Sequence, residues 1–189
     1  DRGDDPVVAD ARAAVETLAR RADGVMHFVE SYRQISRAPE IRARLFEVLG
    51  WAKELEALFR ASDAAAGVEF TLSVESDTLT IDADPDLMCQ VVINLMRNAA
   101  EAARAHSERP EVSLSFSRSG NGRTRIEVAD NGAGVPESLR HDIFLPFFTT
   151  KAKGTGVGLS LARQVVLAHR GSISLATSPS GGALFRIVI

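Results

Sequence analysis

The decisive stretch of this sequence reads Asp84-Pro-Asp-Leu-Met-Cys-Gln-Val-Val-Ile-Asn-Leu-Met-Arg-Asn98-Ala99. Asp84 is a good N-cap and Pro85 suits a first helical turn, so a helix is predicted from here to about His106. An apolar stripe runs along this helix over Leu87, Val91, Leu95, Ala99 and Ala102. The helix is therefore expected to pack one face on a core and to present three amides at the border of that face, namely Gln90, Asn94 and Asn98.

Strands are predicted on both sides of this helix. Apolar and polar residues alternate, as in half-buried strands, near residues 68–74, 79–81, 112–116, 126–128, 172–177 and 183–189. The other expected elements are a short strand at 41–45, a helix at about 46–65 and a helix from about Gly156 to a cap at Gly171. Together they predict an α+β fold in which an antiparallel or mixed β-sheet packs against helices.

The first part of the chain has a different pattern. From Pro6 to Ser36 apolar residues recur with alternating steps of three and four, which is the seam of a heptad helix. A helix of about thirty residues that ends before Pro39 is expected, and it needs partner helices. We expect residues 1–38 to form part of a dimerisation stem and residues 39–189 to form a second domain. A long helix packed on its own domain is the alternative.

Composition excludes several functional classes. With 22 basic and 25 acidic residues the net charge is −3, so no general basic field exists for binding nucleic acid. No apolar run approaches the ~18 residues of a membrane span, and no membrane contact is expected of this segment. The single Cys89 rules out an internal disulfide and a multi-cysteine zinc site, which favours the cytoplasm. Because the chain starts at Asp1 without a methionine, we expect it to be a piece of a longer protein.

Amide and carboxylate side chains are the first candidates for chemistry. The carboxamide oxygen of an asparagine on the helix can bind Mg²⁺ when phosphates and waters complete the shell. Asp130 follows a predicted strand in Asp130-Asn-Gly-Ala-Gly134, where a carboxylate can accept from an exocyclic amine and glycines let a flat ring approach the backbone. Taken alone, each motif has a structural alternative, namely amides bonded to neighbouring loops and a plain turn.

Two further segments point to phosphate. Gly154-Thr-Gly-Val-Gly158 leads into a helix, whose free N–H groups and dipole favour an anion, although it lacks the Gly-Lys-Ser/Thr ending of a P-loop. The segment before it, Ile143-Phe-Leu-Pro-Phe-Phe-Thr-Thr-Lys-Ala-Lys153, is apolar and then cationic. This pattern suits a lid that its aromatic residues anchor while Lys151 or Lys153 meets phosphate. Buried phenylalanines and solvated lysines are the alternative.

In this order, segments 90–99, 130–134, 144–151 and 154–159 closely resemble the N, G1, F and G2 boxes of sensor histidine kinases. The resemblance covers about residues 68–189 and implies the Bergerat ATP-binding fold that these kinases share with gyrase, Hsp90-type chaperones and MutL proteins. It implies ATP and Mg²⁺ as cofactors, Asn98 as metal ligand, Asn94 and Asn98 as catalytic residues, and Asp130 as partner of the adenine amine. The other residues that it implies in nucleotide binding are Gly132, Gly134, Phe148, Lys151, Lys153, Gly154, Thr155, Gly156, Val157, Gly158 and Leu159.

Asn94 distinguishes branches of this superfamily. The ATP-hydrolysing relatives carry a Glu one turn before the magnesium-binding Asn, whereas the amide of Asn94 cannot act as a base. We therefore expect phosphoryl transfer from ATP to a histidine rather than hydrolysis. A non-catalytic nucleotide-binding interaction module and a gyrase- or chaperone-like ATPase stay open as alternatives. Glu101 lies beyond Asn98 in the sequence, and Ala183 replaces a Thr common in these kinases, which is expected to weaken adenine contacts slightly.

The phosphoacceptor histidine of such a kinase has no match in this chain. His27 lacks the adjacent acid and the following Pro of the acceptor motif, so a helix-surface histidine is the preferred interpretation. Residues 28–37 instead resemble the second stem helix of nitrogen-regulation-type sensor kinases, which places the acceptor before Asp1. The chain alone is then expected to be inactive. Its expected partners are the histidine-bearing stem helix of the parent kinase, a second copy in a full-length homodimer and a response regulator.

Overall fold

The computed structural model describes residues 40–151 and 154–189, together with Asp10, Arg12 and Val15, which are helical and exposed. The rest of the predicted stem, including His27, lies outside the described residues, so the role of residues 1–38 stays a prediction. Residues 38–189 form one compact unit, to which the candidate site belongs.

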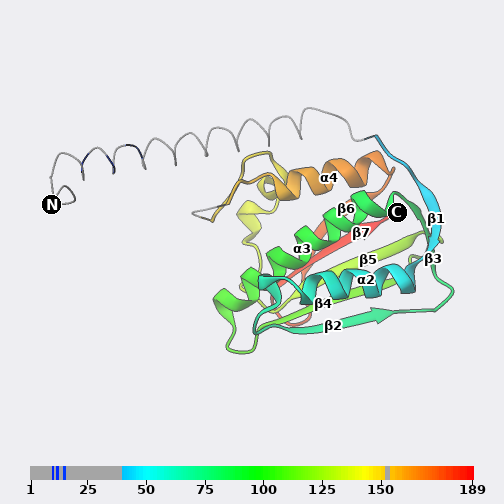
Figure 1. The fold of residues 1–189 in the computed structure, drawn as a ribbon, viewed down its shortest axis with the longest axis horizontal. Coiled ribbons are helices and arrows are strands. Elements are labelled where there is room, and N and C mark those ends of the chain that lie inside the picture. The colour runs from blue at the N-terminus through cyan, green and yellow to red at the C-terminus, as the bar shows by residue number, and fades with distance from the viewer. Residues whose placement is uncertain (1–9, 11, 13–14, 16–39, 152–153) are drawn as a thin grey trace, which may run out of the picture. The chain divides into compact units, whose positions relative to one another are not determined.

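A five-stranded sheet is the centre of this unit (Figure 1). Its strand order is β2-β4-β5-β7-β6, with β2 at Glu69–Val74, β4 at Glu111–Arg118, β5 at Thr124–Asp130, β6 at Ser172–Thr177 and β7 at Ala183–Val188. The predicted α+β fold is confirmed, and the sheet is mixed, because β2 runs parallel to β4 while the other neighbours are antiparallel. A parallel pair needs a crossover connection, and here the long helix supplies it.

A second, two-stranded sheet joins β1 (Arg44–Glu47) to β3 (Thr80–Ala83) in antiparallel register. The strand expected at 41–45 therefore lies a few residues later. The helix that follows, α2 (Val48–Arg60), is shorter than the predicted 46–65, and a separate 3₁₀ turn comes after it. The reason is strand pairing, since Glu47 lies opposite Thr80 and stays extended, so the helix can begin only after it.

Helix α3 (Pro85–His106) confirms the prediction made from the decisive stretch. Its N-cap Asp84 accepts the N–H groups of Asp86 and Leu87 at 3.1 Å through Oδ1, and that of Arg42 at 2.8 Å through Oδ2. Burial acts to raise the pKa of Asp84, but these three donors and the electrostatic effect of His169 together outweigh burial, and the pKa lies below its ordinary value. The cap thus ties the start of α3 to the chain before β1.

Helix α4 (Gly158–Ala168) ends differently from the prediction. Arg170, not Gly171, takes the left-handed conformation after the helix, with a φ of 57°. The N–H of Gly171 then reaches the Val166 carbonyl at 2.9 Å and closes the helix end. A Cβ at Gly171 would lie 2.8 Å from the Val188 carbonyl oxygen. A glycine is therefore needed here because of close packing and not because of its backbone conformation.

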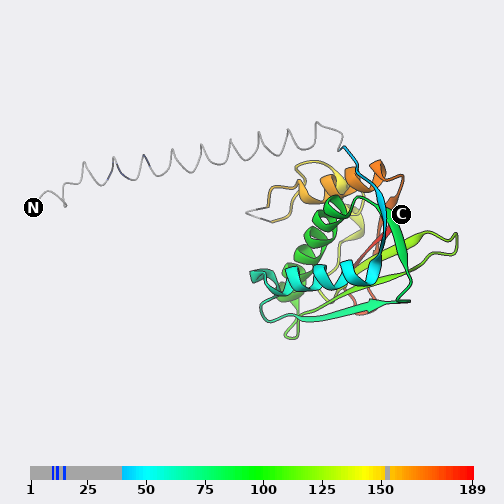
Figure 2. The same cartoon turned by 45° about the vertical axis from the view of Figure 1, so that its right-hand side comes forward.

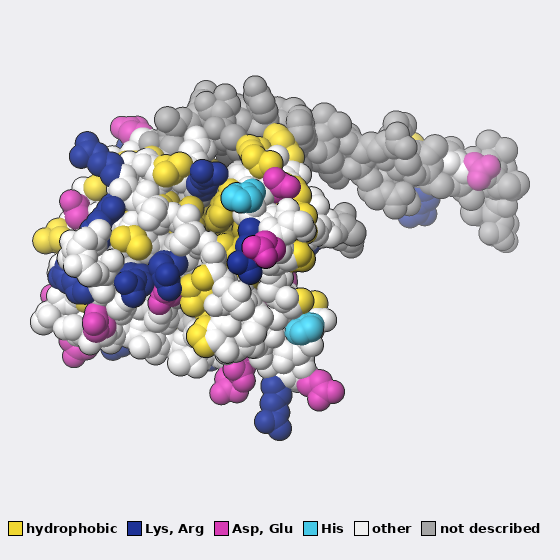
Figure 3. Space-filling model, turned by 180° about the vertical axis from the view of Figure 1, so that it is seen from behind, with side chains coloured by type: hydrophobic (Ala, Val, Ile, Leu, Met, Phe, Trp, Pro, Cys, Tyr) yellow, Lys and Arg dark blue, Asp and Glu magenta, His cyan; other side chains and the backbone are white. Residues whose placement is uncertain are grey.

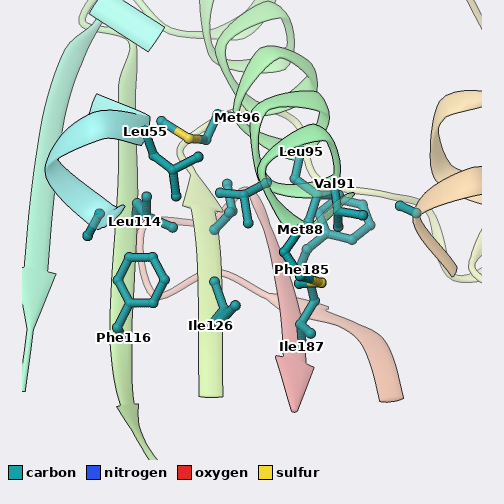
Figure 4. Close-up of a cluster of buried hydrophobic side chains, with 14 of the residues drawn as sticks. Leu55, Met88, Val91, Leu95, Met96, Leu114, Phe116, Ile126, Phe185 and Ile187 are labelled. Atoms are coloured by element: carbon teal, nitrogen blue, oxygen red, sulfur yellow. The ribbon is translucent and has the colours of Figure 1, made fainter. Parts of the chain in front are cut away.

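The three helices α2, α3 and α4 cover one face of the five-stranded sheet (Figures 1 and 2). Figure 4 shows side chains of α3 and of the strands pointing toward one another between these layers. The core side chains that are at most 1% exposed include Met88, Leu95, Phe116, Ile126 and Ile187. Their burial fixes which side of α3 faces the core, and it therefore places the amide stripe at the edge of the core.

The face seen in Figure 3, from behind the view of Figure 1, is largely polar, with hydrophobic side chains scattered among charged and uncharged polar ones. Along β4 and β5, half-buried polar residues such as Ser113, Ser115 and Glu127 alternate with buried ones. The sheet thus has one covered and one polar face. Within the described part of the chain, no helix has the length and apolarity needed to span a membrane.

Candidate functional site

Asn94, Asn98 and Ala102 follow one another at four-residue spacing on α3, and each contacts a different segment of the chain. Asn94 contacts the start of α4, Asn98 contacts Lys151, and Ala102 contacts Gly132 after β5. Residues four apart lie above one another on a helix face. The polar stripe predicted from the sequence therefore continues into the surface that these three segments contact, whereas Gln90, at its other end, is exposed.

Asn94 packs against the first residue of α4. A Cβ at Gly158 would lie 2.5 Å from Asn94 Oδ1 and 2.9 Å from Nδ2, so the glycine allows the two helices to approach this closely. The Nδ2 group is buried and has no hydrogen-bond acceptor among the described residues. A buried donor without an acceptor costs free energy. It therefore marks a place where a ligand with acceptor oxygens would be stabilised.

Asn98 and Glu101 share one cation. The ammonium group of Lys151 donates to Asn98 Oδ1 at 3.0 Å and also to Glu101 Oε2. The contact of Glu101 with Lys151 was not predicted from the sequence. The three-residue spacing between Asn98 and Glu101 could have indicated that the two side chains share a contact, because residues three apart are neighbours on a helix surface.

The segment before the glycine loop folds back onto that loop. Phe147 donates its N–H to the Gly156 carbonyl at 2.9 Å. Gly156 has a φ of 67°, and a Cβ there would collide with the backbone of Phe147. Phe148 is half-buried against the core, and the hydroxyl of Thr149 accepts the N–H of Lys151 at 3.1 Å. Phe148 thus anchors this segment to the core, while a lid whose lysine meets phosphate stays a prediction.

Asp130 ends β5 and is 3% exposed. Its Oδ1 accepts the N–H of Gly132 at 2.8 Å and that of Ala183 at 3.1 Å. Burial raises the pKa of Asp130 above its ordinary value, because the two N–H donors offset burial only in part. Gly182 lies directly beside it, where a Cβ would collide with Asp130 Oδ1. The start of β7 thus positions the carboxylate.

The turn after Asp130 is held from two sides. Gly132 is buried against α3, where a Cβ would lie 2.8 Å from the carbonyl carbon of Ala102, and Gly134 has a φ of 71°. Asn131, for which no role was predicted from the sequence, accepts the Glu111 N–H at 2.9 Å and donates to the Arg109 carbonyl at 2.8 Å. Its position next to Asp130 could have indicated this role, because an amide can donate and accept hydrogen bonds at the same time.

The remaining candidates lie along the glycine loop. Val157 is buried at the N-cap position of α4, Leu159 is half-buried against the core, Thr155 is exposed, and Gly154 packs against Thr149. Lys153 lies outside the described residues. The structure therefore brings Asn94, Asn98, Lys151 and the 154–158 loop together, and Gly132 links Asp130 to the same helix.

Two hollows in the described surface lie away from Asn94 and Asn98. One of about 370 Å³ lies between β1, α2 and the start of α3, and its lining includes Trp51, Glu54 and Cys89. Another of about 160 Å³ lies beside Glu69, Glu111 and Asp130. The candidate site is therefore defined by the cluster of side chains and glycines around α3 and not by either hollow.

Known proteins are similar to this chain in sequence. The histidine kinase-, DNA gyrase B-, and HSP90-like ATPase family matches residues 83–189, more than half of the chain. The signal transduction histidine-protein kinase AtoS of Escherichia coli (strain K12) is 29% identical over 175 residues, which cover 93% of this chain. The chain spans only 28% of the length of AtoS.

Solved structures of histidine kinases have the same fold. The catalytic domain of histidine kinase ThkA is 30% identical with a TM-score of 0.69, and the match covers 78% of this chain and 95% of that one. Full-length ShkA in complex with AMPPNP is 26% identical with a TM-score of 0.74, and the match covers 94% of this chain and 38% of that one. The chain therefore belongs to the histidine kinase-, DNA gyrase B-, and HSP90-like ATPase family, as the catalytic domain of a histidine kinase.

Proposed function

We propose that this chain binds ATP with Mg²⁺ and transfers the γ-phosphoryl group to a histidine outside residues 1–189, as the catalytic part of a two-component sensor kinase. The observation that carries the proposal is the cluster in which Asn94 meets Gly158 and Asn98 meets Lys151. It combines amide groups, an ammonium group and a helix N-terminus in one region. These are the groups that recognise a triphosphate.

The phosphates are assigned to the start of α4. The first N–H groups of a helix have no partner within the helix, and its dipole favours an anion there. Gly158 is the first residue of α4, and the buried Nδ2 of Asn94 lies beside it. Both kinds of donor suit phosphate oxygens, while Lys151 and Lys153 supply positive charge.

The residues present fit Mg²⁺. Asn98 Oδ1 accepts from a cationic group at 3.0 Å, so this oxygen faces a place where positive charge is stabilised. Mg²⁺ is commonly held by one or two protein oxygens, with phosphates and waters completing its octahedron. No larger cluster of His, Cys, Asp or Glu suited to a metal occurs in the described ranges, and none is required. We assign Asn98 as the protein ligand. When bound, the metal neutralises charge on the phosphates.

Asp130 is assigned to the adenine. Its Oδ1 is used by two backbone donors, and Oδ2 can accept from an exocyclic amine. Gly132 lets this turn pack against Ala102 of α3, and the backbone at Gly134 carries no side chain, which allows a flat ring to approach. A guanine carries a carbonyl oxygen at the corresponding position, which a carboxylate acceptor repels.

Asn94 favours phosphoryl transfer over hydrolysis, because an amide cannot remove a proton from water. The chain supplies binding and orientation of the γ-phosphate, and the nucleophile comes from a histidine on another segment. We propose the cytoplasm as its location, a full-length homodimer that carries the histidine on its stem, and a response regulator as the downstream partner. The nitrogen-regulation-type subgroup rests on residues 28–37 and stays a prediction.

The test supplies the missing stem. A separately prepared stem segment of the parent kinase that carries its acceptor histidine is added to this chain with γ-labelled ATP and Mg²⁺. Acid-labile label on the added histidine is expected. The chain alone should show little hydrolysis and little self-labelling, and His27→Ala should change neither. Strong self-labelling that His27→Ala abolishes would identify His27 as the acceptor, and rapid phosphate release without the stem would place the protein among the ATPases.

A further inference from the structure

An ion pair occupies the position assigned to the metal ion. The ammonium group of Lys151 donates to Glu101 Oε2 and, at 3.0 Å, to Asn98 Oδ1. Asn98 and Glu101 are three residues apart on α3, so both lie on the same side of the helix. The side chains of Lys151 and Glu101 are 47% and 41% exposed, which leaves the pair accessible to solvent and to a ligand.

This pair conflicts with a bound nucleotide and metal. An ammonium group and Mg²⁺ on the same carboxamide oxygen of Asn98 would be two cations a few ångströms apart, and they repel each other. The carboxylate of Glu101 has the same sign of charge as a triphosphate. A lysine held by Glu101 is therefore less available to phosphate than a free one.

We propose that Glu101 is a positioning residue, which holds Lys151 on Asn98 while the site is empty, and that binding of ATP with Mg²⁺ breaks this pair. The inference rests on the proposed function. The lysine ammonium stands in for the metal cation and keeps the Asn98 oxygen directed toward positive charge. Phosphate then competes with Glu101 for Lys151, and the metal competes with Lys151 for Asn98.

The exchange of partners also affects the glycine loop. The N–H of Lys151 is bonded to Thr149 Oγ1 at 3.1 Å, and the Gly154 N–H is bonded to the Lys151 carbonyl at 3.1 Å. Movement of Lys151 away from Glu101 is therefore passed to the first residue of that loop. Glu101 couples the cation at Asn98 to the conformation of the residues next to the phosphates.

Calorimetry on four proteins tests the pair, namely the unmodified chain, Glu101→Gln, Lys151→Met and the double variant, each titrated with ATP and Mg²⁺. Glu101→Gln releases Lys151, so it is expected to tighten binding about two- to five-fold, the range set by one exposed ion pair. In the Lys151→Met background there is no pair to release, and the same change should alter the affinity less. An equal gain in both backgrounds would show general charge repulsion only and would overturn the proposal.

Hydrogen exchange in the nucleotide-free chain tests the pair without any ligand. The amides of Lys151 and Gly154 are expected to exchange about two- to five-fold faster in Glu101→Gln, since one exposed ion pair no longer holds them. The matched control is Glu127→Gln, which removes a different ion pair, with Arg186, and should leave both rates unchanged. Unchanged rates in Glu101→Gln would overturn the proposal. Faster rates in a chain that binds no ATP would instead overturn the proposed function alone.

Discussion

Asn94 of α3 lies against Gly158 of α4 so closely that a Cβ on residue 158 would be 2.5 Å from Asn94 Oδ1. The contact sets the spacing between the polar stripe of one helix and the N-terminus of the other. It also holds in place the Asn94 Nδ2 group, which is buried without an acceptor in the described part of the chain. The predicted phosphate site therefore depends on Gly158, because the absence of a side chain there lets Asn94 and the start of α4 come close together.

Gly158→Ala is expected to lower stability and to weaken ATP binding together. The added methyl group forces Asn94 or the start of α4 to move, and overpacking of this kind costs about 1–3 kcal/mol. Gly120→Ala is the matched control, because a Cβ at Gly120 meets nothing within 4 Å. Thermal unfolding and calorimetry measure the two effects. A Gly158→Ala chain with unchanged melting temperature and affinity would contradict the role of this contact.

Asn98→Ala should remove most of the metal-dependent part of the ATP affinity. An interaction with a charged group contributes about 1.5–3 kcal/mol, and Asn98 is the residue assigned to the metal. Titrations with and without Mg²⁺ separate this part from the rest. Gln90→Ala, an exposed amide of the same stripe, should behave as the unmodified chain. If Mg²⁺ strengthens ATP binding equally with and without the Asn98 side chain, the assignment fails.

Asp130→Asn should weaken adenine nucleotides selectively while the fold persists. The amide oxygen can still accept the N–H groups of Gly132 and Ala183, but its NH₂ group then faces the adenine amine, donor against donor. The mismatch is expected to cost about 1–3 kcal/mol of binding. Competition between ATP and GTP, with denaturant unfolding as the check on folding, measures it. Equal competition at the unmodified site would show that Asp130 does not read the base.

Asp84 should make stability depend on pH. Burial opposes its charge, but three N–H donors and the electrostatic effect of His169 together outweigh burial, and its folded-state pKa lies below the unfolded one. Its stabilising contribution is therefore present above the unfolded-state pKa and is lost as the pH falls through the lower, folded-state pKa. Asp84→Ala should cost about 0.5–2 kcal/mol at neutral pH, as for other N-caps, and less in acid.

Denaturant unfolding of Asp84→Ala at neutral and at acidic pH measures this difference. The exposed Asp82, two residues earlier on β3, supplies the control Asp82→Ala, which should cost little at either pH. A cost for Asp84→Ala that stays the same in acid would show that the cap works without its charge.

Local signals predicted much of the fold and of the candidate site. The cap at Asp84 and the periodic stripe of α3 act within one or two turns, so the sequence predicted this helix with its bounds. Most of the strands were predictable in the same way, because alternation is a property of adjacent residues. The predicted glycines at 132, 156 and 158 are places where another segment approaches without room for a side chain.

Other features depended on which segments meet. The pairing of β1 with β3 moved the start of α2, and the parallel contact of β2 with β4 made the sheet mixed. Arg170 took the left-handed position expected of Gly171, and Gly171 packs against Val188 of β7 instead. The sharing of Lys151 by Asn98 and Glu101 joins residues about fifty positions apart.

The sequence by itself determined the local elements, the family resemblance and the set of side chains available for binding a nucleotide. Only the tertiary structure decided the strand order, the cation that Asn98 holds and the donors that position Asp130. The physical reason is the separation along the chain of the residues that interact. Capping and periodicity are energies of neighbouring residues, whereas strand pairing, close packing and ion pairs join residues far apart in the chain and are settled only when the whole core is packed.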